Sequence, residues 1–329
     1  MANRFMDSFD HYVDPNQKYT LTNNVQISAE AGRYGTAGMD MSASDAAYLW
    51  VEFPDFQNEW TVGLGYYRTA IPRGGDLISF QNGTSGSGRE VGVVINPSGT
   101  MSIVSSGSVL TTTAKTVQPN TWYYIEFQAS IGMANTATLH VNSVLWTSAT
   151  GVTQTSGSAA NCIYIGAAGQ PYIDDLYIND ATGTTNNTFW NNTRITYTHP
   201  ATQGFYEDWT PTSGSTSLEI VSNYPPDADF YLSSGSPLDK SSFLMTAPDG
   251  LVGAAKSMQV SYLAKQGDIT LRESRSFLRS VGGVDYPGAT NTMTDEYVYY
   301  REIWETLPSS VTMDATNIAL TQVGVEVIS

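Results

Sequence analysis

Short runs of alternating or continuous apolar residues recur along the first half of the chain, and turn residues separate them. Alternation with a period of two is the pattern of a β-strand, whereas helical periodicity is hard to find here. Gly, Asn and Pro between the runs permit the tight backbone conformations of hairpins. The pattern predicts nine strands before residue 181, at 46–53, 59–67, 76–81, 89–96, 101–106, 121–130, 136–142, 161–167 and 172–180.

The run TWYYIEFQAS at 121–130 distinguishes a core face from a polar face. Ile125 and Phe127 fall on one side of this strand, and Glu126 and Gln128 fall on the other. We therefore expect the first pair to face a core. His140 lies on the polar side of the next predicted strand. The chain has three histidines, none near another or near a cysteine, which gives no basis for a zinc site.

The second half of the chain repeats the strand pattern after a polar stretch. Residues 183–204 lack periodicity and are expected to form a linker, although Phe189, Trp190 and Tyr197 indicate that part of it docks on a neighbour. Residues 269–283 fit either a short helix or a strand. Further strands are predicted at 217–223, 228–234, 242–247, 256–266, 296–306 and 317–329. The expected fold is all-β, with one domain at 1–182 and a second, smaller β-sandwich at 205–329.

Composition and charge narrow the range of partners. The 31 acidic residues outnumber the 15 basic ones, for a net charge of −16, and no basic cluster could follow a phosphate backbone. We therefore expect no nucleic-acid partner. No apolar run is long enough to span a bilayer and no secretory leader is recognised, so no membrane partner is expected. Cys162 lies among apolar residues and is expected to be a core residue, so no disulfide holds the fold.

Motifs for catalysis or cofactor binding are not found in the sequence. It contains no G-x-S-x-G elbow, no phosphate-binding loop and no H-E-x-x-H, so we expect no enzymatic activity and no cofactor. Asp227 and Asp229 could bind calcium, but a turn in which Asp caps backbone N–H groups explains them more simply. Aromatic side chains on a sandwich could stack against sugar rings. The candidates are Trp60, Tyr66, Tyr67, Trp122 and Trp146.

Two adjacent acids, Asp174 and Asp175, interrupt the apolar strand PYIDDLYIND. Neighbouring side chains on a strand point to opposite faces, so these carboxylates converge on one point only if a bulge or turn interrupts the pleat. We interpret them as structural residues of the last strand of the first domain. Asp175 is expected to bond backbone near Asp10 to Tyr12, so Asp10 and His11 are also treated as structural.

Several short motifs give the chain a family resemblance. FMDSFDHY, TWYYIEFQASI, TATLHVNSVLW and YIDDLYIND occur in the order and spacing seen in laminin-G/concanavalin-A-like jelly rolls. A DSFDHY element followed by such a domain resembles uncharacterised structural proteins of tailed bacteriophages. The second half is similar to their C-terminal β domain through PPDADFYLSS, MQVSYLAKQGD and QVGVEV.

The resemblance implies a fold and a place on a virion, assembled in the host cytoplasm. Partners would be other copies of the chain, in a symmetric homo-oligomer such as a trimer, and other virion proteins on the tail, a fibre or the capsid surface. The resemblance brings no active residue: the Glu-x-Asp-x-Glu strand of concanavalin-like glucanases and the metal loops of legume lectins are not found.

Three functions are compatible with the sequence. The first is a structural, non-enzymatic protein of a bacteriophage particle. The second is a carbohydrate-binding module that attaches the particle to a glycan of the host surface. The third is a glycosidase, because two catalytic carboxylates can come from distant strands and leave no local motif.

Overall fold

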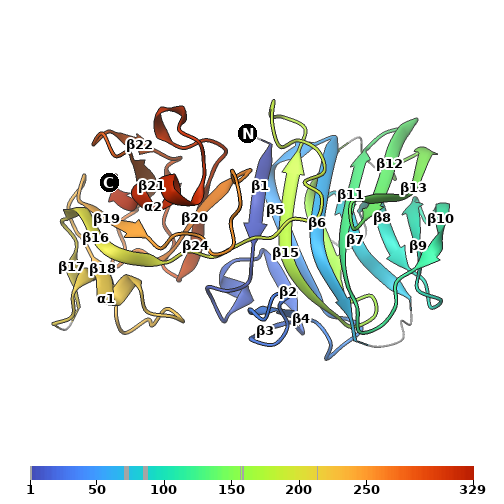
Figure 1. Ribbon diagram of the computed structural model, residues 1–329, viewed down its shortest axis with the longest axis horizontal. Helices are drawn as coiled ribbons and strands as arrows, with labels where there is room; N and C mark the ends of the chain where they lie inside the picture. Colours follow the sequence, from blue (N-terminus) through green and yellow to red (C-terminus); the bar gives the residue numbers. More distant parts are fainter. Residues whose placement is uncertain (1, 70–73, 84–87, 156, 158, 213) are drawn as a thin grey trace. The chain divides into compact units, whose positions relative to one another are not determined.

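A computed structural model gives the fold, and it has two compact units, Met1–Ile195 and Thr196–Ser329. Strands dominate both units, and the helices are short (Figure 1). The predicted all-β fold, a jelly-roll sandwich followed by a second, smaller β-sandwich, is confirmed. The structure describes residues 2–69, 74–83, 88–155, 157, 159–212 and 214–329.

The first unit contains two antiparallel sheets. In the first, called sheet A, β15 pairs with β6 along one side and with β4 and then β1 along the other. The strands of sheet A, in spatial order, are β13 (Val144–Gly151), β12 (Asn135–Val141), β11 (Trp122–Ser130), β6 (Glu59–Arg68), β15 (Pro171–Asp180), β4 (Gly38–Asp40) and β3 (Gln26–Ser28), with β1 (Asn3–Asp7) on β15.

The second sheet of this unit, called sheet B, has seven strands. Their spatial order is β10 (Ser108–Thr116), β9 (Thr100–Ser105), β8 (Arg89–Ile95), β7 (Gly75–Gln81), β14 (Ala160–Gly166), β5 (Tyr48–Gln57) and β2 (Leu21–Asn23). A short 3-10 helix, η1 (Pro15–Gln17), precedes β2. Each of the nine predicted strands overlaps a strand of sheet A or sheet B, because each has the alternation that a half-buried strand requires.

The sheets of the first unit enclose an apolar core. Phe127 of β11 in sheet A contacts Phe80 of β7 in sheet B, with ring centroids 5.1 Å apart. Trp60 of β6 donates its indole N–H to the carbonyl oxygen of Ala160 in β14, 3.0 Å away. Phe80, Phe127 and Trp60 are fully buried, and burying such a side chain contributes about 1.5–3 kcal/mol. Ile125 and Phe127 thus face the core, as predicted.

Residues 183–195, called the strap, belong to the first unit instead of forming a free linker. The unit continues past the expected boundary at 182 as far as Ile195. Trp190 of the strap is buried and stacks on Tyr177 of β15, with ring centroids 4.5 Å apart. Phe189 stacks on His140 at 4.2 Å, so this histidine is covered on the face that was expected to meet solvent. The strap docks because stacking on the sheet removes the rings of Phe189 and Trp190 from water.

The second unit is built on a six-stranded sheet, called sheet C. Its spatial order is β16 (Pro200–Glu207), β19 (Lys240–Met245), β25 (Gln322–Val327), β21 (Glu273–Arg279) and β22 (Asp285–Pro287), with β23 (Asn291–Thr292) on β21. Two separate two-stranded sheets accompany it: β17 (Thr210–Pro211) with β18 (Leu232–Ser233), and β20 (Met258–Ala264) with β24 (Val298–Trp304). Residues 269–283, whose sequence fits either a helix or a strand, contain β21.

Two segments predicted as strands contain helices. The first is α1 (Ser217–Val221), which begins with a capping box: Thr216 and Glu219 each accept a hydrogen bond from the other's backbone N–H. The second is α2 (Ala315–Leu320), whose preceding residue Asp314 accepts from the N–H of Asn317. These polar caps satisfy N–H groups that a helix start leaves unpaired, and they outweigh the short apolar runs. A 3-10 turn, η2 (Pro308–Ser310), lies between β24 and α2.

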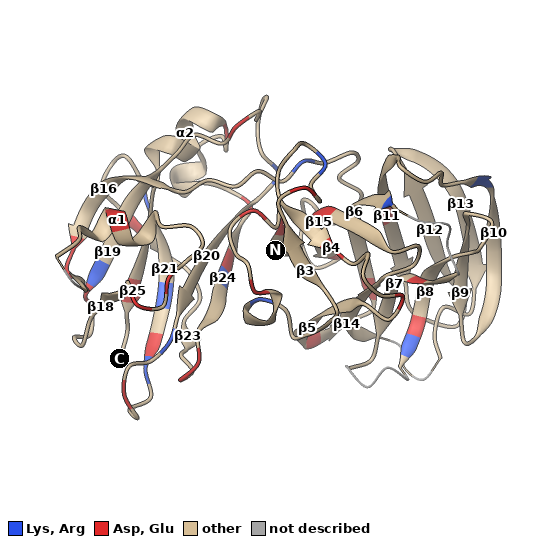
Figure 2. Ribbon diagram, turned by 90° about the horizontal axis from the view of Figure 1, so that it is seen from below, with Lys and Arg blue, Asp and Glu red and all other residues tan. Residues whose placement is uncertain are grey.

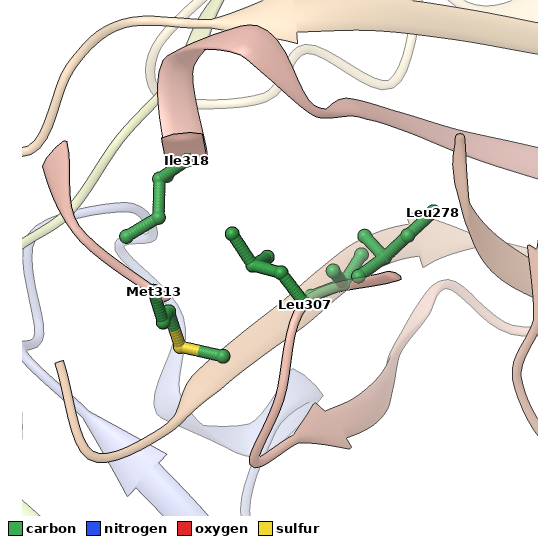
Figure 3. Close-up of a cluster of buried hydrophobic side chains, with 5 residues drawn as sticks. Leu278, Leu307, Met313 and Ile318 are labelled. Carbon is green, nitrogen blue, oxygen red and sulfur yellow. The ribbon is translucent and has the colours of Figure 1, made fainter. Parts of the chain in front are cut away.

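A small apolar cluster forms the core of the second unit. Figure 3 shows Leu278 of β21, Met313, Ile318 of α2 and Leu307 converging, and Val260 of β20 completes the cluster. These side chains come from β21 of sheet C, from β20, from α2 and from the segments on either side of η2. The cluster therefore joins elements that are distant in sequence.

Candidate functional site

Three aromatic side chains form a row across neighbouring strands of sheet A. Tyr67 of β6 is the direct cross-strand partner of both Trp122 in β11 and Tyr172 in β15. The Tyr67 ring lies parallel to that of Tyr172, with an interplanar angle of 9° and a centroid distance of 5.7 Å. It lies 5.3 Å from the Trp122 ring. All three side chains are partly exposed, and we call them the aromatic row.

The aromatic row faces away from the sandwich core. The residue before Tyr67, Tyr66, is fully buried and donates its hydroxyl hydrogen to the carbonyl oxygen of Ala168, 2.8 Å away. Trp60, on the same side of β6 as Tyr66, points to sheet B. Because side chains alternate along a strand, Tyr67 must face outward. Trp60 and Tyr66 are core residues, so the expectation that they stack against sugars is corrected.

Polar groups lie beside the aromatic row. At its Tyr172 end, Asp40 of β4 pairs with Tyr172, and Gln26 of β3 pairs with Asp40 and donates to its carboxylate over 3.1 Å. In the middle of the row, the hydroxyl of Tyr67 donates to the side-chain oxygen of Asn120 over 3.4 Å. Partial burial, together with the negative charge of Asp40, raises the pKa of Tyr172 above its ordinary value. The row therefore combines flat apolar rings with hydrogen-bond acceptors.

The strap covers another part of this outer face of sheet A, over β11, β12 and β15. Tyr177, in the covered part, lies over Gly63, where a Cβ atom would be 2.1 Å from the ring. Its hydroxyl donates to Glu126 over 2.5 Å and accepts from the N–H of Trp190. Glu126 also accepts from the N–H of Asn191, 2.8 Å away, and burial raises its pKa. The face thus has an open part, the aromatic row, and a closed part under the strap.

The adjacent acids Asp174 and Asp175 occupy a β-bulge in β15. Asp174 pairs with Gly65 and Tyr177 pairs with Gly63, so two residues of β15 oppose one residue of β6. Asp175 has a φ of 51°, the left-handed conformation that such a bulge requires. The bulge shifts the alternation, and Tyr177 therefore lies on the same face as Asp174. The sequence left open whether a bulge interrupts the pleat at this point, and the register with β6 shows that one does.

Each carboxylate of the bulge has its own partners. Asp174 accepts from the N–H groups of Arg33 and of Asp175 itself, both over 2.7 Å. Asp175 accepts from the guanidinium of Arg33 over 2.7 Å and from the N–H of Ile195 over 2.6 Å. Burial, followed by mutual repulsion, raises the pKa of Asp174 to about 9. Burial also raises the pKa of Asp175 to about 6, although the hydrogen bond from Ile195 and the charge of Arg33 oppose this shift.

Asp175 therefore fastens the end of the strap, and the partner predicted near Asp10 to Tyr12 is wrong. The sequence could not show that Arg33 and Ile195 come together at this bulge. Asp10 accepts from the N–H of Ala37 over 2.9 Å. His11 is half-buried beside Lys18, 3.0 Å from its ammonium nitrogen. Asp10 and His11 thus have structural contacts, though not the ones expected. Both acids of the bulge are almost fully buried, which leaves no room for a substrate beside them.

The remaining stacking candidate, Trp146, lies apart from the aromatic row. Its ring contacts Tyr123, 6.3 Å away, and the ammonium of Lys115, 5.8 Å away. Tyr123 points to the opposite face of β11 from Trp122. Of the five predicted residues, the structure therefore brings together Tyr67 and Trp122 and adds Tyr172. The sequence analysis missed Tyr172 because its position beside Tyr67 depends on the pairing of β15 with β6. A single sequence does not reveal that pairing.

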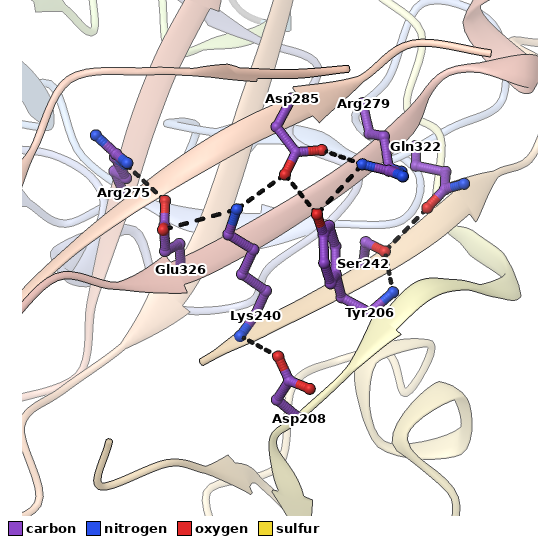
Figure 4. A network of polar contacts seen from close by, with 9 residues as sticks. All are labelled: Tyr206, Asp208, Lys240, Ser242, Arg275, Arg279, Asp285, Gln322 and Glu326. Carbon is purple, nitrogen blue, oxygen red and sulfur yellow. Dashed lines mark hydrogen bonds and ion pairs between the residues drawn. The ribbon is translucent and has the colours of Figure 1, made fainter. Parts of the chain in front are cut away.

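The second unit has a polar network on one face of sheet C (Figure 4). Asp285 of β22 accepts from Lys240 over 2.8 Å, from Tyr206 over 2.8 Å and from Arg279 over 2.6 Å. Glu326 lies 2.8 Å from Arg275 and links it to Lys240. Although partial burial raises the pKa of Asp285, hydrogen bonds from Lys240 and Arg279 lower it on balance. The side chains of Lys240 and Asp285 are partly exposed, and their charges compensate each other.

The described residues give limited support for other kinds of site. Within the described ranges, no group of three or more His, Cys, Asp or Glu residues could hold a metal ion. Asp227 accepts from the N–H of Asp229 over 2.9 Å, which is the turn contact expected as the simpler alternative to calcium. No helix in the described part of the chain is both long and apolar enough to cross a membrane. Basic residues form short, separated segments in each unit (Figure 2).

Comparisons with known proteins give a likeness of structure only. No protein-family model matches the sequence, and no curated protein matches it. An endo-β-1,4-glucuronan lyase from Trichoderma reesei matches 57% of this chain and 97% of its own, with 10% identity and a TM-score of 0.42. Domain 4 of the arabinanase AbnA from Geobacillus stearothermophilus matches 48% of this chain and 76% of its own, with 13% identity and a TM-score of 0.35.

A sialidase from Trypanosoma rangeli matches 37% of this chain, with 12% identity and a TM-score of 0.30, and the match spans 20% of the sialidase. Similarity at this level describes a β fold and carries no activity over to this chain. The expectation of a protein without enzymatic activity is nevertheless corrected by these matches, because the similar structures are those of enzymes or of a domain of an enzyme.

Proposed function

We propose that the first unit binds a neutral saccharide on the aromatic row. The observation that carries the proposal is the placing of Trp122, Tyr67 and Tyr172 side by side on an outward face. Neighbouring strands are about 4.8 Å apart, so three rings form a platform about 10 Å long. The apolar faces of sugar rings can stack on such a platform, and Asp40 at one end and Asn120 beside the central Tyr67 supply acceptors for hydroxyl groups.

The charges beside the aromatic row favour a neutral sugar over an acidic one. Asp40 and Glu30 both act on Tyr172 as negative charges that raise its pKa. The whole chain has a net charge of −16. An acidic saccharide would approach like charges without a compensating cation in the row, and such repulsion lowers affinity. A neutral glycan of a cell surface is therefore the proposed ligand class.

Calorimetric titration with neutral and acidic oligosaccharides tests this proposal. We expect Trp122→Ala and Tyr172→Ala to weaken binding of the neutral ligand at least tenfold, or about 1.4 kcal/mol. Trp146→Ala is the matched control, since it removes a partly exposed Trp outside the row and should leave affinity unchanged. Absence of binding by the unaltered protein, or equal losses in the Trp122 and Trp146 variants, would contradict the proposal.

A second candidate function is that of a structural component of a bacteriophage particle, supported by exposed apolar residues of the second unit. Phe205 is 67% exposed, and its ring lies 4.2 Å from the guanidinium of Arg279. The turn after Arg279 carries Val281 and Val284, which are 77% and 54% exposed. Exposed apolar groups of this kind often mark protein interfaces. The motif resemblance supplies the setting, a virion with copies of this chain and other virion proteins as partners.

Mass determination in solution and protein analysis of purified particles test the second candidate. We expect an oligomer, with a trimer as the specific prediction, that Phe205→Glu weakens because the substitution buries a charge at the contact. Thr316→Glu, which adds the same single negative charge at an exposed polar residue of α2, is the control. A monomer at all concentrations, together with absence from purified particles, would rule out this function.

A further inference from the structure

The N-terminal motif DSFDHY forms a buried cluster that the proposed saccharide site does not use. Asp7, at the end of β1, and Lys18, just after η1, lie with the carboxylate Oδ1 and the ammonium Nζ 3.0 Å apart. Their side chains are 0% and 1% exposed. A pair of opposite charges so deeply buried is unfavourable, because desolvation of both ions offsets their attraction. The pair therefore has a reason to react or to be held by strong contacts.

Other side chains arrange the pair for condensation. The hydroxyls of Tyr12 and Tyr19 both donate to the second oxygen of Asp7, Oδ2, over 2.6 and 2.7 Å. The backbone N–H of Phe9 donates to Oδ1 over 2.8 Å. The two hydroxyls aimed at one carboxyl oxygen are what a tetrahedral intermediate with a developing oxyanion requires.

A histidine stands on the other side of the lysine. Nε2 of His11 lies 3.0 Å from Nζ of Lys18, and since an ammonium group can only donate, this nitrogen must be the acceptor. Burial, followed by the charge of Lys18, lowers the pKa of His11 to about 3, so the imidazole is neutral at physiological pH. A base this weak does not take the proton from an ammonium group, so His11 orients Nζ through this hydrogen bond, and Oδ1 of Asp7, 3.0 Å from Nζ, is the proton acceptor.

We propose that Lys18 and Asp7 form an intramolecular isopeptide bond. One proton passes from Nζ of Lys18 to Oδ1 of Asp7, the neutral amine attacks Cγ, and Tyr12 and Tyr19 stabilise the charge on Oδ2. A second proton passes from Nζ to Oδ1 in the tetrahedral intermediate, the Cγ–Oδ1 bond breaks, and Oδ1 leaves as water. The third hydrogen stays on the amide nitrogen. No oxidant or further reactant is needed.

The apolar surroundings favour the amide product. The Lys18 nitrogen lies 4.9 Å from the ring centre of Tyr12 and 5.6 Å from that of Phe5. Two charges among these rings become one uncharged amide, whose oxygen keeps the hydrogen bonds from Tyr12 and Tyr19. The fixed positions of both groups replace a bimolecular encounter with an intramolecular one. The resulting cross-link ties β1 to the segment after η1 in a chain whose one cysteine cannot form an internal disulfide.

The intact mass of the full-length denatured protein tests this proposal. We expect a mass lower than that of the sequence by one water molecule, with fragment spectra locating the loss between Asp7 and Lys18. A mass equal to that of the sequence, or a water loss located elsewhere, would overturn the proposal. This measurement needs no variant, so a failure of folding cannot obscure it.

Two variants sharpen the test. Lys18→Arg keeps the positive charge but has no reactive amine, and its mass should equal that of its own sequence. His11→Asn should form the lighter species at least tenfold more slowly after refolding, because the hydrogen bond from the imidazole that orients Nζ of Lys18 is lost. Equal rates in the His11 variant would overturn the role of this histidine, and a water loss in the Lys18 variant would overturn the bond itself.

Discussion

A lysine, an aspartate and a tyrosine meet in both units, and the two clusters differ in burial. In the first unit, Lys18 and Asp7 are enclosed by aromatic rings and a neutral histidine. In the second, Lys240 and Asp285 are about one-fifth exposed. The contact distances are similar, 3.0 and 2.8 Å, so distance does not distinguish the clusters. What differs is the solvent around the charges.

The difference shows how the surroundings decide what the same side chains do. The second cation on Asp285 is Arg279, which stays protonated and cannot act as a base. Water and Glu326 also help to hold Lys240 as an ammonium ion, and its contacts with acids raise its pKa although burial opposes this. An exposed cluster of this type forms an ordinary ion-pair network. The buried cluster has a neutral imidazole that orients the lysine, and the dry surroundings that favour condensation.

Removing the buried acid should have the largest effect on stability. Asp7→Ala leaves the charge of Lys18 buried without its carboxylate and prevents the cross-link, so we expect the first unit to lose at least about 3–5 kcal/mol of unfolding free energy. Hydrogen exchange read separately in each unit measures this loss. An effect below about 1 kcal/mol, the range of exposed ion pairs, would show that burial does not distinguish the two clusters.

Asp175→Ala should have the next largest effect, confined to the strap and the strands beneath it. It removes the acceptor for the Ile195 N–H and the partner of Arg33, and hydrogen bonds to a charged group contribute about 1.5–3 kcal/mol each. We expect faster hydrogen exchange in residues 183–195 and unchanged saccharide affinity. Lost affinity with unchanged melting would contradict the structural role of this residue.

Asp174 should make the stability of the first unit depend on pH. Its pKa is raised from 3.8 to about 9 in the folded state, so the folded protein binds the proton more tightly than the unfolded chain does. The contribution of this group to stability is then full below about pH 4 and is lost as the pH rises toward about 9. Melting curves between about pH 5 and pH 9 should fall less steeply for Asp174→Asn than for the unaltered protein. Parallel curves would disprove the raised pKa.

The smallest effect is expected in the exposed cluster. Asp285→Ala should cost about 1 kcal/mol or less, because solvent screens partly exposed ion pairs, and added salt should reduce the difference further. Unfolding of the second unit at low and high salt provides the measurement. A loss as large as that of Asp7→Ala, independent of salt, would mean that the two clusters behave alike.

The period-two pattern was enough to predict the sandwich but not the details that create its sites. Ile125 and Phe127 alternate with polar residues, and they face the core as expected. The bulge at Asp175 leaves no periodic signal, because its left-handed backbone follows from pairing with β6 and from the bond to Arg33. The helix at 217–221 did have a local signal, the capping box of Thr216 and Glu219, which the apolar run concealed.

The candidate sites depended on contacts between distant segments. Tyr67 and Trp122 could be named from sequence as aromatic strand residues, but Tyr172 joined them only once the strand order was known. Lys18 likewise could not be assigned from sequence. Asp7 and His11 belong to the motif DSFDHY, but Lys18 lies outside it and meets them only in the folded chain. Residues whose role depends on cross-strand pairing or on burial are those that periodicity cannot identify.

Tryptic digestion of the denatured protein compares the two lysines directly in one sample. The account predicts full cleavage after Lys240 and none after Lys18, so that Phe5–Arg33 is recovered as one species lighter by one water molecule. Recovery of Phe5–Lys18 and Tyr19–Arg33 as separate peptides of unaltered mass, in the yield found for cleavage after Lys240, would contradict it.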